Sequence, residues 1–435
     1  MKKIVLIFFV AISLNGFGQT TQAVPDPGFK QLFDTVTNQW LCADANYSIQ
    51  LPDGSSLWLF GDTFLGDLDE NGSIMPGFQF IRNSVILQTA DERIGLYSGS
   101  FSTGASDFFP TNDDTWYWPA HGITLNDTLI VFLERYKHED TGTPGFDFVY
   151  DGTDLAYMSP ENLEIYFIEP LDFSYINKDI RFGNQILSND DGYIYMYGRK
   201  DEYWGTARYA APVVARVSNN FRGSWEFWGD GIWNNECQFT TTISENACSE
   251  QYSVITYGDE YILITQETWL GKKIFATNSP NPYGPFTSGN QILIYETPES
   301  YFTYNTWAHI QFIENENLLL SYNVNGGWDS IVNDADQYRA RFLRIPMNEL
   351  TGTQEIVTVK NLFECYPVPC SSNISIKTYS SDTYTLILRN LKGFSLFKKE
   401  ITTFVCLPVN TLPKGVYFLT LESEHSTETK RILIL

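Results

Sequence analysis

Residues 42–63 read CADANYSIQLPDGSSLWLFGDT, and this stretch decides how the chain folds. Its PDGS segment has a proline and a glycine at turn positions, and the flanking ANYSIQL and LWLF favour strand. The pattern predicts a β-hairpin with Asp44 and Asp62 at its open end. Facing residues of a hairpin share one sum of residue numbers, and a turn centred on Asp53 pairs Asp44 with Asp62. Directly opposed residues have Cβ atoms only about 4.5–5.5 Å apart, so two carboxylates there would repel each other.

Four further segments repeat this hairpin pattern, each with its own polar turn. They are WPAHGITLNDTLIVFLERY, RFGNQILSNDDGYIYMYGRK, EQYSVITYGDEYILITQETW and WAHIQFIENENLLLSYNVN. When the five first strands are aligned at Asp44, His121, Gly183, Glu250 and His309, the intervals are 77, 62, 67 and 59 residues. Such self-similarity indicates an array, and a unit of this length holds a four-stranded sheet whose edges are protected by radial closure. The sequence therefore predicts a five-bladed β-propeller; a β-sandwich is the alternative, for which five hairpins are an odd number.

The pattern changes after about residue 355. No long stretch has helical periodicity, so the fold class is all-β throughout, with a small C-terminal β-sandwich after the propeller. The domains are then a signal peptide at 1–19, because MKKIVLIFFVAISLNGFGQ joins two lysines to an apolar run and small residues, a propeller at 20–355 and a C-terminal domain at 356–435. Nothing later approaches the roughly 20 consecutive apolar residues that a membrane-spanning helix needs.

The net charge limits the classes of ligand that this chain is expected to bind, and the cysteines indicate which disulfides are possible. With 28 basic and 52 acidic side chains the net charge is -24, which argues against nucleic acid, polyanionic glycans and anionic lipid as partners and favours neutral ligands. Export would allow the six cysteines to pair; Cys237 with Cys248 is the first candidate, and Cys42 is expected to be buried.

The first strands of a propeller line its channel, so the starts of the five hairpins should meet at one mouth. The sum rule places His121 near Glu134, Glu250 opposite Glu267 and His309 opposite Tyr322. Arg208 is an alternative partner that would neutralise Glu250. Aromatic residues make up 16% of the chain, and they either pack the core or form stacking platforms for sugars. The rings expected around the mouth are Trp116, Trp118, Trp269, Tyr304 and Trp307.

Two acids at one mouth suit glycoside hydrolysis. One carboxyl group protonates the leaving oxygen while the other attacks or activates water, and mutual repulsion raises one of the two pKa values. If Asp44 and Asp62 are cross-strand partners, their separation is near the roughly 5–5.5 Å of retaining enzymes, which favours retention. Each aspartate could instead cap a turn or a strand end. No zinc-ligand spacing, Gly-x-Ser-x-Gly elbow or phosphate-binding loop is present, so no cofactor is expected. A channel-bound calcium ion is an open alternative, although no ligand spacing demands it.

Two resemblances extend this interpretation. The C-terminal segments YPVPCSS, LPKGVYFLTL and KRILIL resemble the C-terminal sorting domain of the type IX secretion system. That resemblance implies export through the type IX machinery, to the medium or the outer cell surface. Residues 40–346 resemble the five-bladed propeller superfamily of furanosidases, including the endo-D-arabinanases of glycoside hydrolase family 183 and related families of uncharacterised domains. The motifs that carry it are ADANYSI, WLFGDT, FIRNSVI, SPNPYGPF, WAHIQF and YRARFLRIP.

The second resemblance implies a catalytic pair, Asp44 and Asp62. It also implies substrate contacts at Asn83, Trp118, His121 and His309, to which the mouth adds Glu250, Trp269 and Trp307. WAHIQF departs from the pattern, because Ile310 stands where related chains often have proline. Two hypotheses result: a secreted endo-acting furanosidase, with an arabinan as the first candidate substrate, and a non-catalytic glycan-binding propeller at the cell surface.

Overall fold

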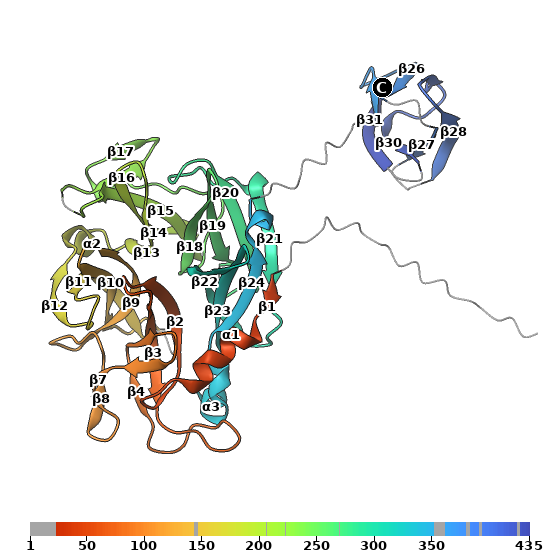
Figure 1. The fold of residues 1–435 in the computed structure, drawn as a ribbon. Helices are drawn as coiled ribbons and strands as arrows, with labels where there is room; N and C mark the ends of the chain where they lie inside the picture. Colours follow the sequence, from red (N-terminus) through yellow and green to blue (C-terminus); the bar gives the residue numbers. More distant parts are fainter. Residues whose placement is uncertain are drawn as a thin grey trace, which may run out of the picture. The chain divides into compact units, whose positions relative to one another are not determined.

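The computed structural model describes residues 23–142, 147–205, 207–221, 223–268, 270–351, 362–379, 383–390, 394–423 and 427–435. The predicted signal peptide, residues 1–19, lies outside them. The chain divides into two compact units, Met1–Gly352 and Thr353–Leu435. Strands dominate both units (Figure 1), as the all-β prediction requires.

The first unit contains five antiparallel sheets, and each begins with the first strand of one predicted hairpin. The first sheet has β2 (Trp40–Gln50), β3 (Ser56–Leu65), β4 (Gln79–Ile81), β5 (Ser84–Gln88) and β6 (Arg93–Leu96). The second has β9 (Thr115–Leu125), β10 (Thr128–His138), β11 (Phe148–Met158) and β12 (Ile165–Pro170). The third has β13 (Ile180–Ser188), β14 (Tyr193–Trp204), β15 (Ala207–Ser218), β16 (Glu226–Gly229) and β17 (Ile232–Asn234).

The last two sheets complete a β-propeller. The fourth has β18 (Tyr252–Tyr257), β19 (Glu260–Gln266), β20 (Lys273–Ser279) and β21 (Gln291–Glu296). The fifth has β22 (Phe302–Glu314), β23 (Asn317–Asn325), β24 (Arg341–Pro346) and the N-terminal β1 (Val24–Pro25). The first strands contact one another in a ring, β2 with β9, β9 with β13, β13 with β18, β18 with β22 and β22 with β2. Because β1 pairs with β24, the N-terminal segment contributes the outer strand of the fifth sheet.

Short elements connect these sheets. The helices are α1 (Pro27–Gln31), α2 (Asp172–Ile176) and α3 (Trp328–Asn333). The 3₁₀ turns cover Leu32–Thr35, Cys237–Phe239, Ser288–Asn290, Ala335–Tyr338 and Met347–Glu349. A two-stranded ribbon, β7 (Ser98–Ser100) with β8 (Gly104–Ser106), projects beside the first sheet (Figure 1). No helix among the described residues is long and apolar enough to cross a membrane.

The opening hairpin folds as its turn chemistry predicts. The Asp53 carboxylate accepts a hydrogen bond from the Ser55 amide at 2.9 Å, and Gly54 takes a φ of 87°, which glycine adopts without a Cβ penalty. Both strands are buried almost throughout, with Trp58 and Phe60 in one aromatic core cluster. Burying side chains of this size contributes roughly 1.5–3 kcal/mol each.

Bulges interrupt the first strands of four of the five sheets. The bulges lie at Asn46 in β2, at Ala120 and His121 in β9, at Gly183 and Asn184 in β13, and at Asn305 and Thr306 in β22. They correct two predicted pairings. Glu134 lies opposite Trp118 rather than His121, because the turn has two residues and a bulge follows it. His309 lies opposite Leu319 rather than Tyr322, because β22 is irregular between His309 and Glu314.

The second unit is the predicted small β-sandwich. One sheet contains β25 (Phe363–Tyr366), β26 (Asn373–Thr378) and β29 (Phe404–Pro408). The other contains β27 (Tyr384–Asn390), β28 (Ser395–Ile401), β30 (Gly415–Glu422) and β31 (Thr427–Ile434). Both sheets contribute to a single apolar core, which includes Ile374, Leu386 and Leu419.

Candidate active site

Asp44 and Asp62 meet at a bulge in the opening hairpin. Partners in β2 and β3 follow the predicted sum on both sides of it, from Ala43 opposite Thr63 to Gln50 opposite Ser56. Between these pairs, Gly61 and Asp62 together lie opposite the single residue Asp44. Bulges re-aim side chains and are common beside active sites. The predicted register is therefore correct for the hairpin but is broken at the two acids themselves.

Asp44 has hydroxyl donors and forms no ion pair with any residue that the structure describes. The Tyr304 hydroxyl donates to Asp44 Oδ2 at 2.9 Å, and Tyr338 also hydrogen-bonds this carboxylate. Burial, followed by the negative charge of Asp62, raises the pKa of Asp44 from 3.8 to about 7, against the opposing effect of the tyrosine hydrogen bonds. Asp44 consequently carries a proton in much of the population at neutral pH.

Asp62 has both a cation and a ring donor. Arg82 Nη1 contacts the two carboxylate oxygens at 3.3 Å each, and Trp118 Nε1 donates to Oδ1 at 2.9 Å. Burial raises the pKa of Asp62 above its ordinary value, and Arg82 and Trp118 offset only part of this effect. The Asp62 side chain keeps 20% of its surface exposed. The two acids therefore differ in environment, since Asp62 has a cationic partner, Arg82, whereas Asp44 has the hydroxyls of two tyrosines.

The partners of Asp62 are themselves held in place. The backbone amide of Arg82 donates to Asp107 Oδ1 at 2.7 Å, and its guanidinium lies 4.5 Å from the Trp116 ring centre. Trp118 packs against Tyr136 with ring centres 4.4 Å apart. These contacts restrict the donors to one arrangement around Asp62.

Gly61 permits the close approach of the two acids. A Cβ at this position would lie 2.7 Å from Asp44 Oδ1 and 3.4 Å from the Trp118 ring. A real Cβ does not approach an oxygen so closely, so any larger residue would displace the carboxylate. The sequence shows this glycine in WLFGDT without indicating its role.

An exposed tryptophan lies near this pair. Trp328, at the start of α3, is 53% exposed and packs against Phe64 and Phe80 at 5.1 and 5.6 Å. Phe64 in turn contacts Tyr338, the hydroxyl donor to Asp44. An indole that packs against other rings and still has half its surface exposed suits stacking against a sugar. Neither Trp328 nor Tyr338 was predicted, because nothing in their local sequence distinguishes them from core aromatics.

Glu250 belongs to an ion-pair network instead of an acid pair. It accepts from Arg199 Nε and Arg208 Nη1 at 2.7 Å each, so the alternative partner Arg208 is the one observed. Arg199 also pairs with the buried Glu134 at 2.7 Å. Burial alone would raise the pKa of Glu250, but Arg199 and Arg208 outweigh it and hold that pKa well below its usual range. Glu250 is 46% exposed, so it remains accessible as a fixed anionic acceptor.

Four predicted substrate contacts are buried, namely Asn83, His121, Trp307 and His309. Asn83 hydrogen-bonds the backbone of Phe109 and Tyr117, and His121 Nδ1 accepts from the Ile186 amide at 3.0 Å. The His309 ring lies between the hydroxyls of Ser48 and Ser321, at 2.7 and 2.9 Å. The structure thus brings Trp118 and Glu250 to accessible positions and encloses these four side chains. Trp269 lies outside the described residues.

The described cysteines are free thiols, and the described residues contain no cluster suited to a metal ion. Cys237 and Cys248 are buried thiols that form no disulfide, which corrects the predicted pair, and burial raises the pKa of Cys237 to about 12. Cys42 is buried, as expected. Within the described part of the chain, no group of three or more His, Cys, Asp or Glu side chains is arranged to hold a metal ion.

Comparisons with known proteins identify both units. Residues 26–361 match the family model described as "Domain of unknown function (DUF5005)". Residues 364–435 match the "Secretion system C-terminal sorting domain". This second match indicates type IX secretion, to the outer surface or the extracellular space. A search of curated proteins finds no match.

Solved structures share the propeller fold. A "putative hydrolase" from Bacteroides ovatus ATCC 8483 matches with a TM-score of 0.63 and 22% identity, over 74% of this chain and 90% of that one. Weaker matches include the family 43 β-xylosidase/α-arabinofuranosidase CoXyl43 from a compost metagenome, at a TM-score of 0.42 and 14% identity, over 74% and 94% of the two chains. An endo-arabinase from Bacteroides thetaiotaomicron VPI-5482 matches at 0.38 and 12%, over 72% and 96%. The first similarity shows the fold alone, so the activity has to be inferred from the geometry of the site.

Proposed function

Because this chain belongs to the family described as domain of unknown function DUF5005, we propose its activity from the site itself: a secreted glycoside hydrolase that cleaves furanosidic linkages. The observation that carries the proposal is the carboxyl pair, Asp44 and Asp62, in contrasting environments at one bulge. We also propose five blades, supported by the closed ring of five first strands.

The two aspartates take different roles. Asp44, with a pKa of about 7 and no cation, is the general acid that protonates the glycosidic oxygen. Asp62, ionised beside Arg82, attacks the anomeric carbon from the opposite side. Asp44 then acts as the base for the water that releases the product. Retention is the expected outcome, because Asp44 lies opposite Gly61 and Asp62 on adjacent strands of the hairpin, which favours a short separation of the two carboxyl groups.

The substrate is proposed to be an arabinan cleaved internally. Support for arabinan comes from the resemblance of the motifs ADANYSI, WLFGDT and FIRNSVI to those of the endo-D-arabinanases. These motifs contribute Asp44, Asp62 and Arg82. The net charge of -24 favours a neutral polymer over an anionic one. Trp118 and Trp328 are the stacking platforms near the acids.

One observation favours the second candidate, a glycan-binding propeller without catalysis. The Arg82 ion pair could hold Asp62 permanently as a hydrogen-bond acceptor for sugar hydroxyls. Such a protein has no need for a second carboxyl group whose pKa is raised to about 7. For that reason hydrolysis is the preferred proposal.

The test is reducing-sugar release by the full chain from D-arabinan, L-arabinan, a fructan and a galactofuranan. Asp44→Asn and Asp62→Asn should each abolish release, whereas Glu267→Gln, which alters an exposed acid outside the pair, should not. The anomeric form of the first product, read by NMR, reports retention or inversion. Binding of a glycan without any release would establish the second candidate.

A further inference from the structure

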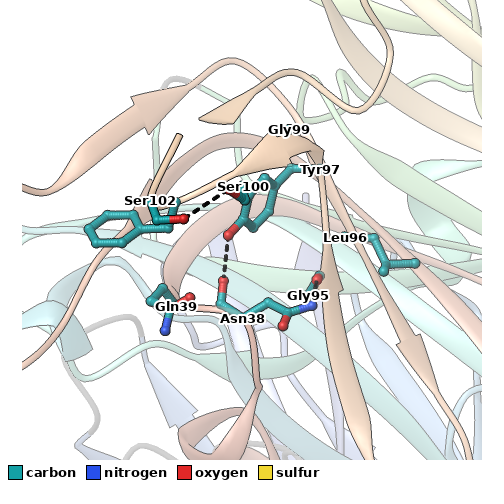
Figure 2. Close-up of a pocket in the computed structure, with 9 residues that line it drawn as sticks. Asn38, Gln39, Gly95, Leu96, Tyr97, Gly99, Ser100 and Ser102 are labelled. Carbon is teal, nitrogen blue, oxygen red and sulfur yellow. Dashed lines mark hydrogen bonds between the residues drawn. The ribbon is translucent and has the colours of Figure 1, made fainter. Parts of the chain in front are cut away.

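A separate cavity of about 490 Å³ lies beside the first sheet. Residues 38–39, 95–97 and 99–102 line it, from the segment before β2, the end of β6 and the β7–β8 ribbon (Figure 2). Ligand pockets typically measure about 300–1,000 Å³, so the volume suits one or two sugar rings.

The lining of this cavity has the chemistry of a neutral sugar site. None of its residues carries an acidic or basic side chain, although the chain has 28 basic and 52 acidic residues. It offers the amide of Gln39, the hydroxyls of Ser100 and Ser102, which hydrogen-bond each other at 3.1 Å, and the aromatic ring of Tyr97 (Figure 2). Mixed apolar surface and a few polar groups give orientation and specificity to an uncharged polyhydroxyl ligand.

The walls of the cavity are fixed before any ligand binds. The Tyr97 hydroxyl donates to the Asn38 carbonyl at 2.9 Å, and Asn38 Nδ2 donates to the Gly95 carbonyl at 2.9 Å. Asn38 and Gln39 have φ of 59° and 55°, an uncommon region for residues other than glycine. The Gln39 carboxamide hydrogen-bonds no other described residue, which leaves it available to a ligand.

The cavity and the acid pair share the same strands. Gln39 immediately precedes β2, and its carbonyl accepts from the Gly66 amide at 2.7 Å, just beyond the end of β3. The Gln79 side chain ties the β7–β8 ribbon to β4, three residues before Arg82. Gln39 precedes Asp44 by five positions, at most about 17 Å of extended strand. This separation is within the length of a polysaccharide segment of a few sugar residues.

We propose that this cavity is an accessory subsite that binds a neutral sugar residue of the polysaccharide cleaved between Asp44 and Asp62. This inference rests on the proposed function. A second contact on the same chain raises the effective concentration of the polymer at the acids without taking part in the chemistry. Short substrates, which cannot reach the cavity, gain nothing from it.

The test compares polymer with a short substrate in two variants of the full chain. Gln39→Gly removes the free carboxamide and accepts the positive φ, and Ser102→Trp fills the cavity. For each, the KM for the polymer relative to that for an aryl furanoside should rise about three- to tenfold, the effect of losing one ligand contact. Ser106→Ala, on the same ribbon but outside the lining, should leave that ratio unchanged.

Binding is also measured without turnover, by calorimetric titration of arabino-oligosaccharides into Asp44→Asn. Adding Gln39→Gly or Ser102→Trp to this inactive chain should weaken affinity by the same factor. Unchanged polymer KM ratios and unchanged oligosaccharide affinity in both variants would overturn the subsite. Absence of hydrolysis by the wild type would overturn the proposed function instead, and the titration would still decide whether the cavity binds sugar.

Discussion

Replacement of Asp44 by asparagine should abolish activity on arabinan and, at alkaline pH, stabilise the protein. The carboxyl of Asp44 has a pKa of about 7 in the folded chain and 3.8 when unfolded. Between these values the folded state binds more protons, so stability falls as pH rises through this window. Above pH 7 the full penalty of the buried charge is present, and below about pH 4 it is absent.

The size of the stabilisation by Asp44→Asn follows from the difference between the pKa of Asp44 in the folded and in the unfolded chain. The difference of 3.2 pKa units between 7 and 3.8 corresponds to about 4 kcal/mol. Asp44 is partly exposed, so solvent screening reduces this to about 2 kcal/mol. With an unfolding entropy of about 2.1 cal/mol/K per residue over about 330 residues, Asp44→Asn should raise Tm by about 3 °C at pH 8.

Calorimetric Tm values for wild type and Asp44→Asn at pH 4, 6 and 8 provide the assay. The difference in Tm between Asp44→Asn and the wild type should be near zero at pH 4 and largest at pH 8. Asp62→Asn is the matched control: it leaves Arg82 without its carboxylate, so it should gain less at pH 8 or lose stability. A Tm difference for Asp44→Asn that does not change with pH would refute the reasoning.

Three further substitutions probe the surroundings of the pair. Arg82→Met removes the cation beside Asp62, so the acid limb of the pH profile of kcat/KM should move up by about one unit. Trp118→Phe keeps the ring but removes the N–H donor to Asp62, and kcat should fall about 10- to 150-fold, the value of a hydrogen bond to a charged group. Gly61→Ala forces Asp44 Oδ1 away from a Cβ that would lie 2.7 Å from it, so kcat should fall at least about tenfold with little change in Tm.

Each of these has a control elsewhere in the propeller. Arg93→Met, Trp233→Phe and Gly289→Ala make the same chemical changes away from the acids, and Gly289 has open space where its Cβ would lie. An unmoved acid limb in Arg82→Met would mean that Asp62 does not set it. Wild-type kcat in Trp118→Phe or Gly61→Ala would contradict the assigned geometry.

Local turn chemistry made much of the fold predictable. The five hairpins, their order and the switch to a small C-terminal β domain follow from polar turns between apolar runs. The pairing sum taken from Asp53 is correct along most of β2 and β3. For the same reason the sequence brings Asp44 and Asp62 to one end of one sheet.

The bulges were not predictable, because nothing in a strand's alternation marks the position of an extra residue. His121 lies in one of these bulges and His309 follows another, and both are buried and hydrogen-bonded instead of lining an open mouth. The contacts of Arg82 with Asp62 and of Tyr304 with Asp44 were not predictable either, because they arise from packing between segments that are distant in sequence.

The most direct test of the central claim is the rate of wild type, Asp44→Asn and Asp62→Asn on arabinan and on an aryl furanoside with a good leaving group. On the aryl furanoside, whose leaving group needs no proton, Asp44→Asn should release one equivalent of the aryl group rapidly and then turn over slowly, because the base for the second step is missing. On arabinan it should be inactive, and Asp62→Asn should be inactive on both substrates. Full arabinan cleavage by Asp44→Asn, or no cleavage of either substrate by the wild type, would contradict the claim.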